Sequence, residues 1–252
     1  MSIDQQDEFE AMKRIGTIVA NCLALLKASA RPGMTTGELD EMAGQYLASQ
    51  GAISAPKSVY KFPGFVCLSL EKSAAHGIPG DTKIEDGDLL NIDVSAQKDG
   101  FFADNGESIV VGDGAPEKKF LCEAVNQALD VALRAAKAGT PIASMGKKIE
   151  KMARNHGLTV IQNLGGHGIG RSLHEAPEFI PSFHDRRDKR IFSKNQVVAI
   201  EPFLSNGATW IEQADDGWTL FHPKYYTAQR EHTVMITKDK PYIFTQPDTS
   251  FD

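Results

Sequence analysis

The spacing of apolar positions along the chain predicts four amphipathic helices arranged in two pairs. Between residues 7 and 30, apolar side chains recur three and four positions apart, which is the period of one helix face. A Pro-Gly break ends this helix, and Thr35 with Glu38 has capping-box spacing for a second helix that ends near Gly51. The same order of helix, break and helix returns in residues 117–138 and 144–157.

Alternating apolar segments follow each helix pair and predict strands. They span residues 65–70, 89–94 and 101–111 in the first half, and 158–162, 196–203 and 232–237 in the second. The shared order is a weak internal repeat, about 8–112 and 115–240, and it predicts a pseudo-twofold α+β fold with a largely antiparallel sheet. Because no Ser- or Pro-rich linker divides the halves, we expect residues 1–252 to form one domain.

Two aspartates lie on predicted strands that a short turn joins. Asp93 and Asp104 flank the turn residues 98–100. A turn centred between 98 and 99 makes the two carboxylates direct cross-strand partners, and a turn centred between 99 and 100 makes them diagonal neighbours. Both registers place them on one face. Carboxylates among apolar residues need a positive partner, which leaves Arg or Lys, a shared proton or a metal ion.

Three further metal-competent residues lie in or beside apolar segments, and the neighbouring strands offer no obvious Arg or Lys. They are His167, Glu201 and Glu231. One imidazole with four carboxylates suits two divalent ions, of Mn, Fe(II), Co or Zn, and disfavours a closed structural zinc site. The competing interpretation is that each acidic residue is merely solvated or hydrogen-bonded, which is the commoner fate of a lone Asp in a strand.

Other enzyme classes find little support in the motifs. Residue 178 is Glu, so His174 does not begin an H-E-x-x-H helix, and residues 165–170 lack the full dinucleotide-binding spacing. No G-x-S-x-G elbow or local cysteine signature suggests a covalent nucleophile. The glycines on either side of His167 are better explained by close approach of the backbone. His76 and His174 lie in a turn and a loop, where each is either a surface residue or part of the site.

Composition limits the partners and the compartment. The chain of 252 residues is 41% hydrophobic and carries a net charge of −6, which makes nucleic acid, DNA included, an unlikely main partner. Its three cysteines lie far apart in the sequence, as in a reducing cytosol. The acidic start of the chain is unlike a secretory signal, and the longest apolar stretch, about 15–26, is too short to cross a membrane. We therefore expect a cytoplasmic protein without a membrane contact.

Taken together, an ordered set of motifs resembles type I methionine aminopeptidase, of the M24 metallopeptidases. The motifs extend over most of the chain, from about residue 8 to 240: His76-Gly77-Ile78-Pro79, Asn91-Ile92-Asp93-Val94, Ala103-Asp104, Gly166-His167-Gly168-Ile169-Gly170, Leu173-His174-Glu175-Ala176-Pro177, Ile200-Glu201-Pro202 and Glu231-His232-Thr233. The resemblance implies the pita-bread fold, a pseudo-twofold α/β domain with a dinuclear metal site on a curved central sheet.

The resemblance also implies a role for each residue of the site. Glu201 is expected to act as general base towards the attacking water, and His174 and His76 are expected to contact the scissile peptide and stabilise the tetrahedral intermediate. One ion would be held by Asp104, His167, Glu201 and Glu231, and the other by Asp93, Asp104 and Glu231. Asn105 stands where Thr is frequent in the family, which could alter the hydrogen bonding around Asp104.

The implied substrate is the initiator methionine of a nascent polypeptide, followed by a small second residue. The family resemblance assigns Phe62, Cys67, His76 and Trp218 to the methionine pocket, whereas core packing is the ordinary interpretation of Phe62, Cys67 and Trp218. The basic loop 184–194 is either a ribosome contact or only a solvated loop. A monomer is the expected state.

Two other functions compete with this one. An X-Pro aminopeptidase or dipeptidase shares the five ligand types, but such relatives generally carry an additional N-terminal domain that 252 residues cannot hold. A pita-bread binding protein without catalysis would be expected to have lost ligands, and all five are present here.

Overall fold

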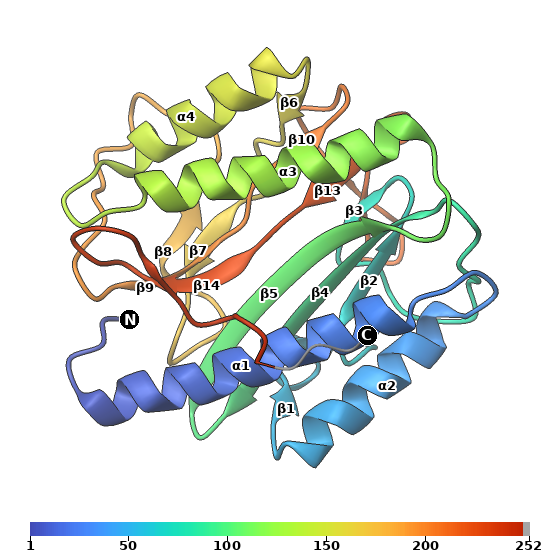
Figure 1. Cartoon of the computed structure of the whole chain (residues 1–252), viewed down its shortest axis with the longest axis horizontal. Coiled ribbons are helices and arrows are strands. Elements are labelled where there is room, and N and C mark those ends of the chain that lie inside the picture. The colour runs from blue at the N-terminus through green and yellow to red at the C-terminus, as the bar shows by residue number, and fades with distance from the viewer. Residues whose placement is uncertain (249–252) are drawn as a thin grey trace.

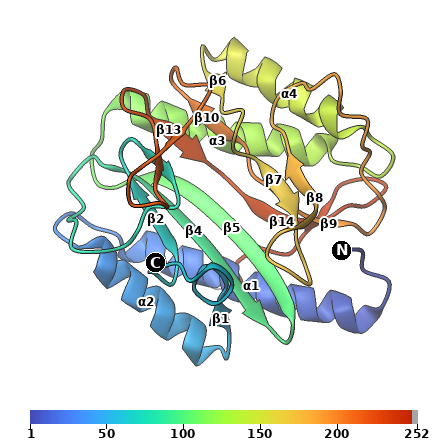
Figure 2. The same ribbon diagram turned by 180° about the vertical axis from the view of Figure 1, so that it is seen from behind.

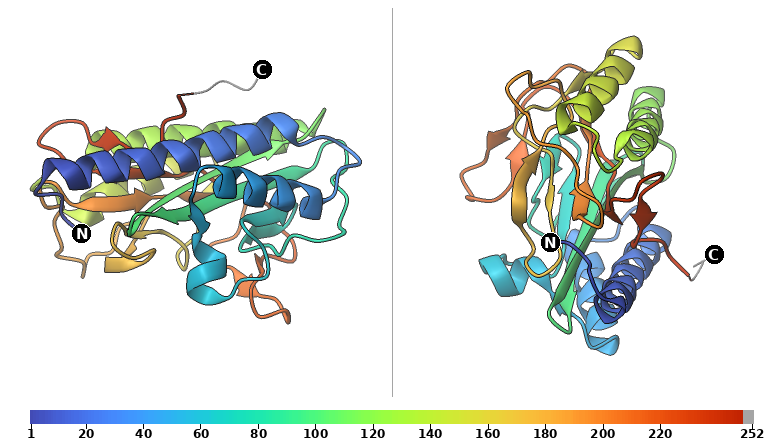
Figure 3. Two further views of the ribbon diagram at one scale, coloured as in Figure 1. Left: turned by 90° about the horizontal axis from the view of Figure 1, so that it is seen from below. Right: turned by 90° about the vertical axis from the view of Figure 1, so that its left-hand side faces the viewer.

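The computed structural model describes residues 1–248, in which four long helices lie on one side of a set of antiparallel strands (Figures 1 and 3). The four predicted helices are confirmed, with ends within three residues of expectation: α1 (Gln6–Ser29), α2 (Thr36–Ser49), α3 (Pro116–Ala135) and α4 (Ile142–Asn155). Residue 252, the expected end of the domain, lies outside the described residues.

Helix α2 begins at the capping box that the sequence predicts. The backbone N–H of Glu38 donates to Oγ1 of Thr35 at 3.1 Å, and the backbone N–H of Thr35 donates to Oε2 of Glu38 at 2.7 Å. This reciprocal capping box satisfies backbone donors that the first turn leaves open, and loss of such a cap typically costs about 1 kcal/mol. Gly33 has a φ of +88°, a conformation in which a Cβ would be strained.

The strands form four small sheets, and every strand pair in the described part of the chain is antiparallel. In the first half, β4 pairs with β5 along one edge and with β2 and β1 along the other, and in the second half the order is β15-β14-β9-β7-β8. The first-half strands are β1 (Ile53–Ser54), β2 (Cys67–Leu70), β3 (Ser73–Ala75), β4 (Leu89–Lys98) and β5 (Phe101–Val110). The remaining strands are β6 (Thr159–Val160), β7 (Gly166–Gly168), β8 (Glu175–Ile180), β9 (Val197–Ile200), β10 (Phe203–Ser205), β11 (Glu212–Gln213), β12 (Leu220–Phe221), β13 (Thr227–Gln229), β14 (His232–Met235) and β15 (Tyr242–Ile243).

The predicted strands recur in the structure, with two informative differences. The segment 196–203 is divided into β9 and the start of β10, because Pro202 has no N–H to donate to a ladder and the chain leaves the sheet at Glu201. The sequence does not predict the single π-helical turn η1 (Pro56–Tyr60), strand β8, or the short strands β1, β3, β7, β11, β12, β13 and β15. Their sequences show neither clean alternation nor helical spacing, so periodicity could not find them.

The β4–β5 hairpin selects one of the two registers left open by the sequence. Asp99 and Gly100 both have positive φ, 53° and 80°, as a two-residue type I′ turn requires. Asp93 therefore pairs with Gly106, and Asp104 pairs with Ser95. The two aspartates are diagonal neighbours on one face of the hairpin rather than direct partners.

Two separate clusters of buried apolar residues support the two halves. The first includes Leu26 of α1 and the face of β4 that carries Ile92 and Val94, and the second lies under α3 and α4. Because side chains alternate along a strand, the residues between those of the first cluster, Asp93 and Ser95, face away from α1. Figure 2 shows the molecule from the side opposite to that of Figure 1, with strands in front of helices. The helices thus leave one strand face available for polar chemistry.

Cavity-forming substitutions test whether the two halves form one cooperative unit. Leu26→Ala and Leu121→Ala remove side chains that are 0% and 1% exposed, one from each cluster. Each should lower the free energy of unfolding by about 2–5 kcal/mol. Denaturant unfolding followed by circular dichroism and fluorescence should still give a single transition for both variants. Two resolved transitions in either variant would show that the halves unfold separately.

Candidate active site and metal centre

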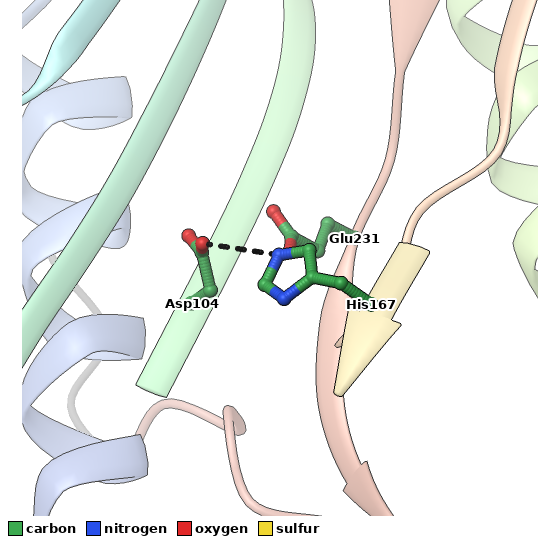
Figure 4. Close-up of side chains that lie close together, drawn as sticks. All are labelled: Asp104, His167 and Glu231. Carbon is green, nitrogen blue, oxygen red and sulfur yellow. Dashed lines mark ion pairs between the residues drawn. The ribbon is translucent and has the colours of Figure 1, made fainter. Parts of the chain in front are cut away.

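A group of acidic residues and one histidine comes together where the two halves meet. Asp104 projects from β5 and His167 from β7, while Glu231 precedes β14, and the three point towards one another (Figure 4). One ligand atom from each lies within 4.8 Å of the others. Nε2 of His167 is 3.9 Å from Oδ2 of Asp104 and 3.6 Å from Oε1 of Glu201. Asp93 adjoins Asp104 on the hairpin face, so all five expected residues converge.

His167 is held in one orientation by the backbone around it. Its Nδ1 lies 3.0 Å from the carbonyl oxygen of Gly168, so Nδ1–H donates there and the Nε2 lone pair faces the carboxylates. A Cβ at Gly166 would lie 2.3 Å from the carbonyl oxygen of Ala199, and one at Gly168 would lie 2.3 Å from that of Ala176. The glycines therefore allow the neighbouring strands to approach the ligand-bearing strand, as the sequence predicted.

The acidic residues are fixed by different parts of the chain. The backbone of Asp104 is clamped by Thr233, whose Oγ1 accepts from the Asp104 N–H and donates to its carbonyl oxygen, both at 2.8 Å. Nε2 of Gln229 donates to Oε2 of Glu201 at 3.0 Å and, less closely, to Oε2 of Glu231 at 3.3 Å. Oε1 of Gln229 accepts from Asn91 at 2.8 Å. One buried amide thus orients two carboxylates.

Gln229 shows what sequence reasoning missed at this site, whereas Asn105 is a residue that the sequence did single out. Gln229 was not selected, although strand alternation two positions before Glu231 could have indicated that it shares the same face. A Cβ at Gly106 would lie 2.4 Å from Oε1 of Gln229, so glycine leaves the space for it. The backbone of Asn105 supplies a hydrogen bond to the Asp104 carboxyl that opposes the rise of its pKa, whereas Oδ1 of the Asn105 side chain accepts from Nη1 of Arg230 at 3.1 Å.

The site is electrostatically unfavourable in the absence of a cation. Desolvation, followed by repulsion from the neighbouring carboxylates, raises the pKa of Asp104, Glu201 and Glu231 well above their usual values. Desolvation also raises the pKa of Asp93, and it lowers the pKa of His167 to about 3, which keeps that imidazole neutral. These acidic groups therefore share a small volume with no protonated histidine to offset their charge.

The donor set fits divalent metal ions. Among the described residues, Oδ1 of Asp104 and Oε1 of Glu231 are buried without a hydrogen-bond partner. Such orphaned carboxylate oxygens are expensive unless a cation binds them. The free Nε2 of His167 supplies a nitrogen donor beside them. Carboxylate oxygens with one imidazole are typical ligands of Mn, Fe, Co and Zn sites.

A cavity of about 110 Å³ opens beside the acidic cluster. Phe62 and Cys67 are 2% and 8% exposed, and the rings of Phe62 and Trp218 meet edge to face with centroids 5.3 Å apart. Burial raises the pKa of Cys67, so its thiol is neutral and apolar in character. His76 and His174 also line the cavity and are solvent-exposed. The complete lining is Pro56, Tyr60, Phe62, Cys67, His76, Asp93, Ser95, Asp104, His167, Leu173, His174, Glu201 and Trp218.

The comparisons with known proteins agree with the geometry. The profile of metallopeptidase family M24 matches residues 10–238. Methionine aminopeptidase 2 of Bacillus subtilis is 45% identical over 248 residues, which cover 98% of this chain and 100% of that protein. The chain belongs to the methionine aminopeptidases of family M24.

Solved structures place the fold in the same family. The crystal structure of methionine aminopeptidase from Rickettsia prowazekii is 31% identical, with a TM-score of 0.92 and coverage of 98% of this chain and 100% of that one. The expected pita-bread fold is thereby confirmed. A prolidase from Pyrococcus furiosus, 21% identical with a TM-score of 0.78, shares the fold, and the match covers 98% of this chain and 66% of that one. Within residues 1–248, no helix has the length and apolar run needed to cross a bilayer.

A charge-neutralising substitution tests the electrostatic description of the metal-free centre. Because the pKa of Asp104 is raised in the folded state, its carboxyl opposes folding at every pH above the unfolded value of about 4. Asp104→Asn should therefore raise the Tm of the metal-free protein at pH 7. The gain should shrink as the pH is lowered towards about 4, because the carboxyl then becomes protonated in the unfolded state as well as in the folded state.

Differential scanning calorimetry of both proteins in the presence of a chelator, from pH 4 to pH 8, measures this effect. Asp113→Asn is the matched control, because Asp113 is an exposed aspartate whose pKa is lowered by Lys119, and this substitution should not raise the Tm at pH 7. A metal-free Asp104→Asn protein that melts below the wild type at pH 7 would contradict the description.

Proposed function

We propose that this protein hydrolyses the peptide bond after an N-terminal methionine, using two divalent metal ions. The observation that supports this most directly is the cross-strand pairing of Cys67 with Asp93, which joins the apolar cavity to the acidic cluster. A side chain seated in the cavity against Phe62 and Trp218 would place its own carbonyl group next to the carboxylates. The site thus combines a pocket for one terminal side chain with a hydrolytic centre.

In this proposal Asp104, His167, Glu201 and Glu231 would hold one ion, and Asp93, Asp104 and Glu231 would hold the other. The orphaned oxygens of Asp104 and Glu231 support this assignment, because a cation would satisfy a buried oxygen that lacks a hydrogen bond. When bound, the ions would act as Lewis acids towards the scissile carbonyl and lower the pKa of the attacking water. Co, Mn, Fe(II) and Zn all suit this ligand set.

The side chains of the chain then perform the proton transfers and the positioning. Glu201 acts as general base and accepts the proton of the attacking water, a role that suits a carboxylate of raised pKa. Nε2 of Gln229 donates to Oε2 of Glu201 and leaves Oε1 of Glu201 available to accept the proton. His174 and His76, at the mouth of the cavity, contact the scissile peptide and stabilise the charge that develops on its oxygen.

The cavity accounts for the choice of methionine. A neutral thiol and two aromatic rings give Cys67, Phe62 and Trp218 a soft apolar surface that suits an unbranched thioether. With His76 and His174 lining the same cavity, the space beyond the scissile bond is limited, so we propose a preference for a small second residue. An X-Pro peptidase would instead have to accommodate proline at that position.

The physiological substrate in this proposal is the N-terminus of a nascent chain in the cytoplasm, and the enzyme acts as a monomer. The loop 184–194 would supply a transient ribosome contact. It contains the ion pairs Arg190 with Asp188 at 2.7 Å and Arg187 with Asp185 at 3.8 Å. Arg187 remains 96% exposed by side chain, and Arg186 and Lys189 are also exposed, so basic groups remain accessible to phosphates.

A peptide panel tests the proposed function. Metal-depleted protein resupplied with Mn, Fe(II), Co or Zn should release free methionine from Met-Ala-Ser and none from N-acetyl-Met-Ala-Ser, because the blocked amine cannot enter the site. Ala-Pro-Ser serves as the test of the X-Pro alternative. Cleavage of Ala-Pro-Ser in preference to Met-Ala-Ser would favour that alternative, and no cleavage with any metal would favour a binding protein without catalysis.

Glu201→Gln tests the proposed general base. The amide keeps the size of the side chain but cannot accept the proton, so kcat for Met-Ala-Ser should fall by about 10²–10⁴-fold. Because Gln can also weaken a metal ligand, the metal content of the variant is measured by elemental analysis alongside. Near-wild-type kcat in the folded, metal-loaded variant would remove Glu201 from the role of base.

A further inference from the structure

The mouth of the cavity contains a tyrosine that neither the sequence motifs nor the ligand set includes. Tyr60 ends the π-helical turn η1, and the next residue, Lys61, takes a left-handed conformation with φ of 63°. The hydroxyl of Tyr60 lies 2.7 Å from Nδ1 of His174. The side chain is 44% exposed, so core packing does not explain its position.

Tyr60 and His167 both contact the ring of His174. The ring of His174 lies 4.1 Å from that of His167, centroid to centroid, and 5.7 Å from that of Tyr60. His174 belongs to the irregular segment between β7 and β8, where no ladder fixes its backbone. Within residues 1–248, the bond from Tyr60 is the hydrogen bond that ties this imidazole to another side chain. It therefore restrains a ring whose other close ring contact is tilted packing against His167.

This bond also selects a tautomer. A phenol hydroxyl is the better donor of the pair, and burial together with the charge of Asp104 raises the pKa of Tyr60, so its proton stays in place. When the hydroxyl donates to Nδ1, that nitrogen carries a lone pair and the proton of a neutral ring resides on Nε2. A ring with Nε2–H can donate to a substrate oxygen, whereas the other tautomer would present a lone pair there and repel it.

We propose that Tyr60 is a positioning residue, whose hydroxyl holds His174 in the Nε2–H tautomer and in the orientation from which it donates to the scissile carbonyl oxygen. This inference rests on the proposed function, because it assigns His174 its partner in that reaction. Its effect is expected in the transition state, where the charge on that oxygen is greatest, rather than in the binding of the methionine side chain.

Tyr60→Phe tests the inference, because it removes only the hydroxyl from a partly exposed ring. In the zinc-loaded protein, which is diamagnetic, kcat for Met-Ala-Ser should fall by about 3–10-fold with KM little changed, as expected for the loss of one hydrogen bond that acts in the transition state. In ¹⁵N spectra of histidine-labelled protein, His174 should change from one tautomer with Nε2–H to a mixture of two.

Tyr242→Phe is the matched control. Tyr242 is 36% exposed and packs against Phe9 and Phe244, outside the residues that line the cavity, so its variant should keep both kcat and the His174 spectrum. An unchanged kcat or an unchanged tautomer in Tyr60→Phe overturns the inference. Failure of the wild-type protein to release methionine overturns the proposed function instead, and the spectra of the two proteins still decide whether Tyr60 sets the tautomer.

Discussion

Repulsion among carboxylates buried in one small volume is the constraint on which this structure depends. The four carboxylates come from strands or strand ends in both halves of the chain, and their ionised forms repel one another in the absence of a cation. They belong to Asp93, Asp104, Glu201 and Glu231. The fold overcomes this repulsion with two apolar clusters, one under each helix pair, and with hydrogen bonds that fix the acidic side chains from behind. The centre is thus prepared for cations before any are bound.

Burial is graded from the base of the site to its mouth. Glu231 and His167 are 1% and 4% exposed, whereas His76 and His174 are exposed to solvent. The acidic groups of the candidate metal centre lie where water is excluded, whereas the two histidines that would contact the substrate in the proposed function lie where water has access. Placing them at different depths lets one small cavity serve both purposes, because desolvation strengthens electrostatic interactions at the base without closing the entrance.

The sequence predicted the parts of this protein that obey a simple period. The four helices follow from apolar spacing, the cap of α2 follows from Thr35 and Glu38, and the shared face of Asp93 and Asp104 follows from strand alternation in either register. Tyr60 could not be found in this way, because η1 has no periodic pattern and its partner is 114 residues away. The convergence of the ligands required the family resemblance, since periodicity alone does not say which strands of the two halves meet.

The ladder between β2 and β4 links two properties that could have been separate. Cys67 at the pocket and Asp93 at the acidic cluster are direct partners, so a shift of β2 that enlarged the pocket would also disturb an acidic residue on the adjoining strand. Phe62 and Trp218, in contrast, lie outside the named strands. The loops that carry these two rings can therefore change in sequence and alter which substrate side chain the pocket accepts. The sheet would keep the acidic cluster unchanged while they do so.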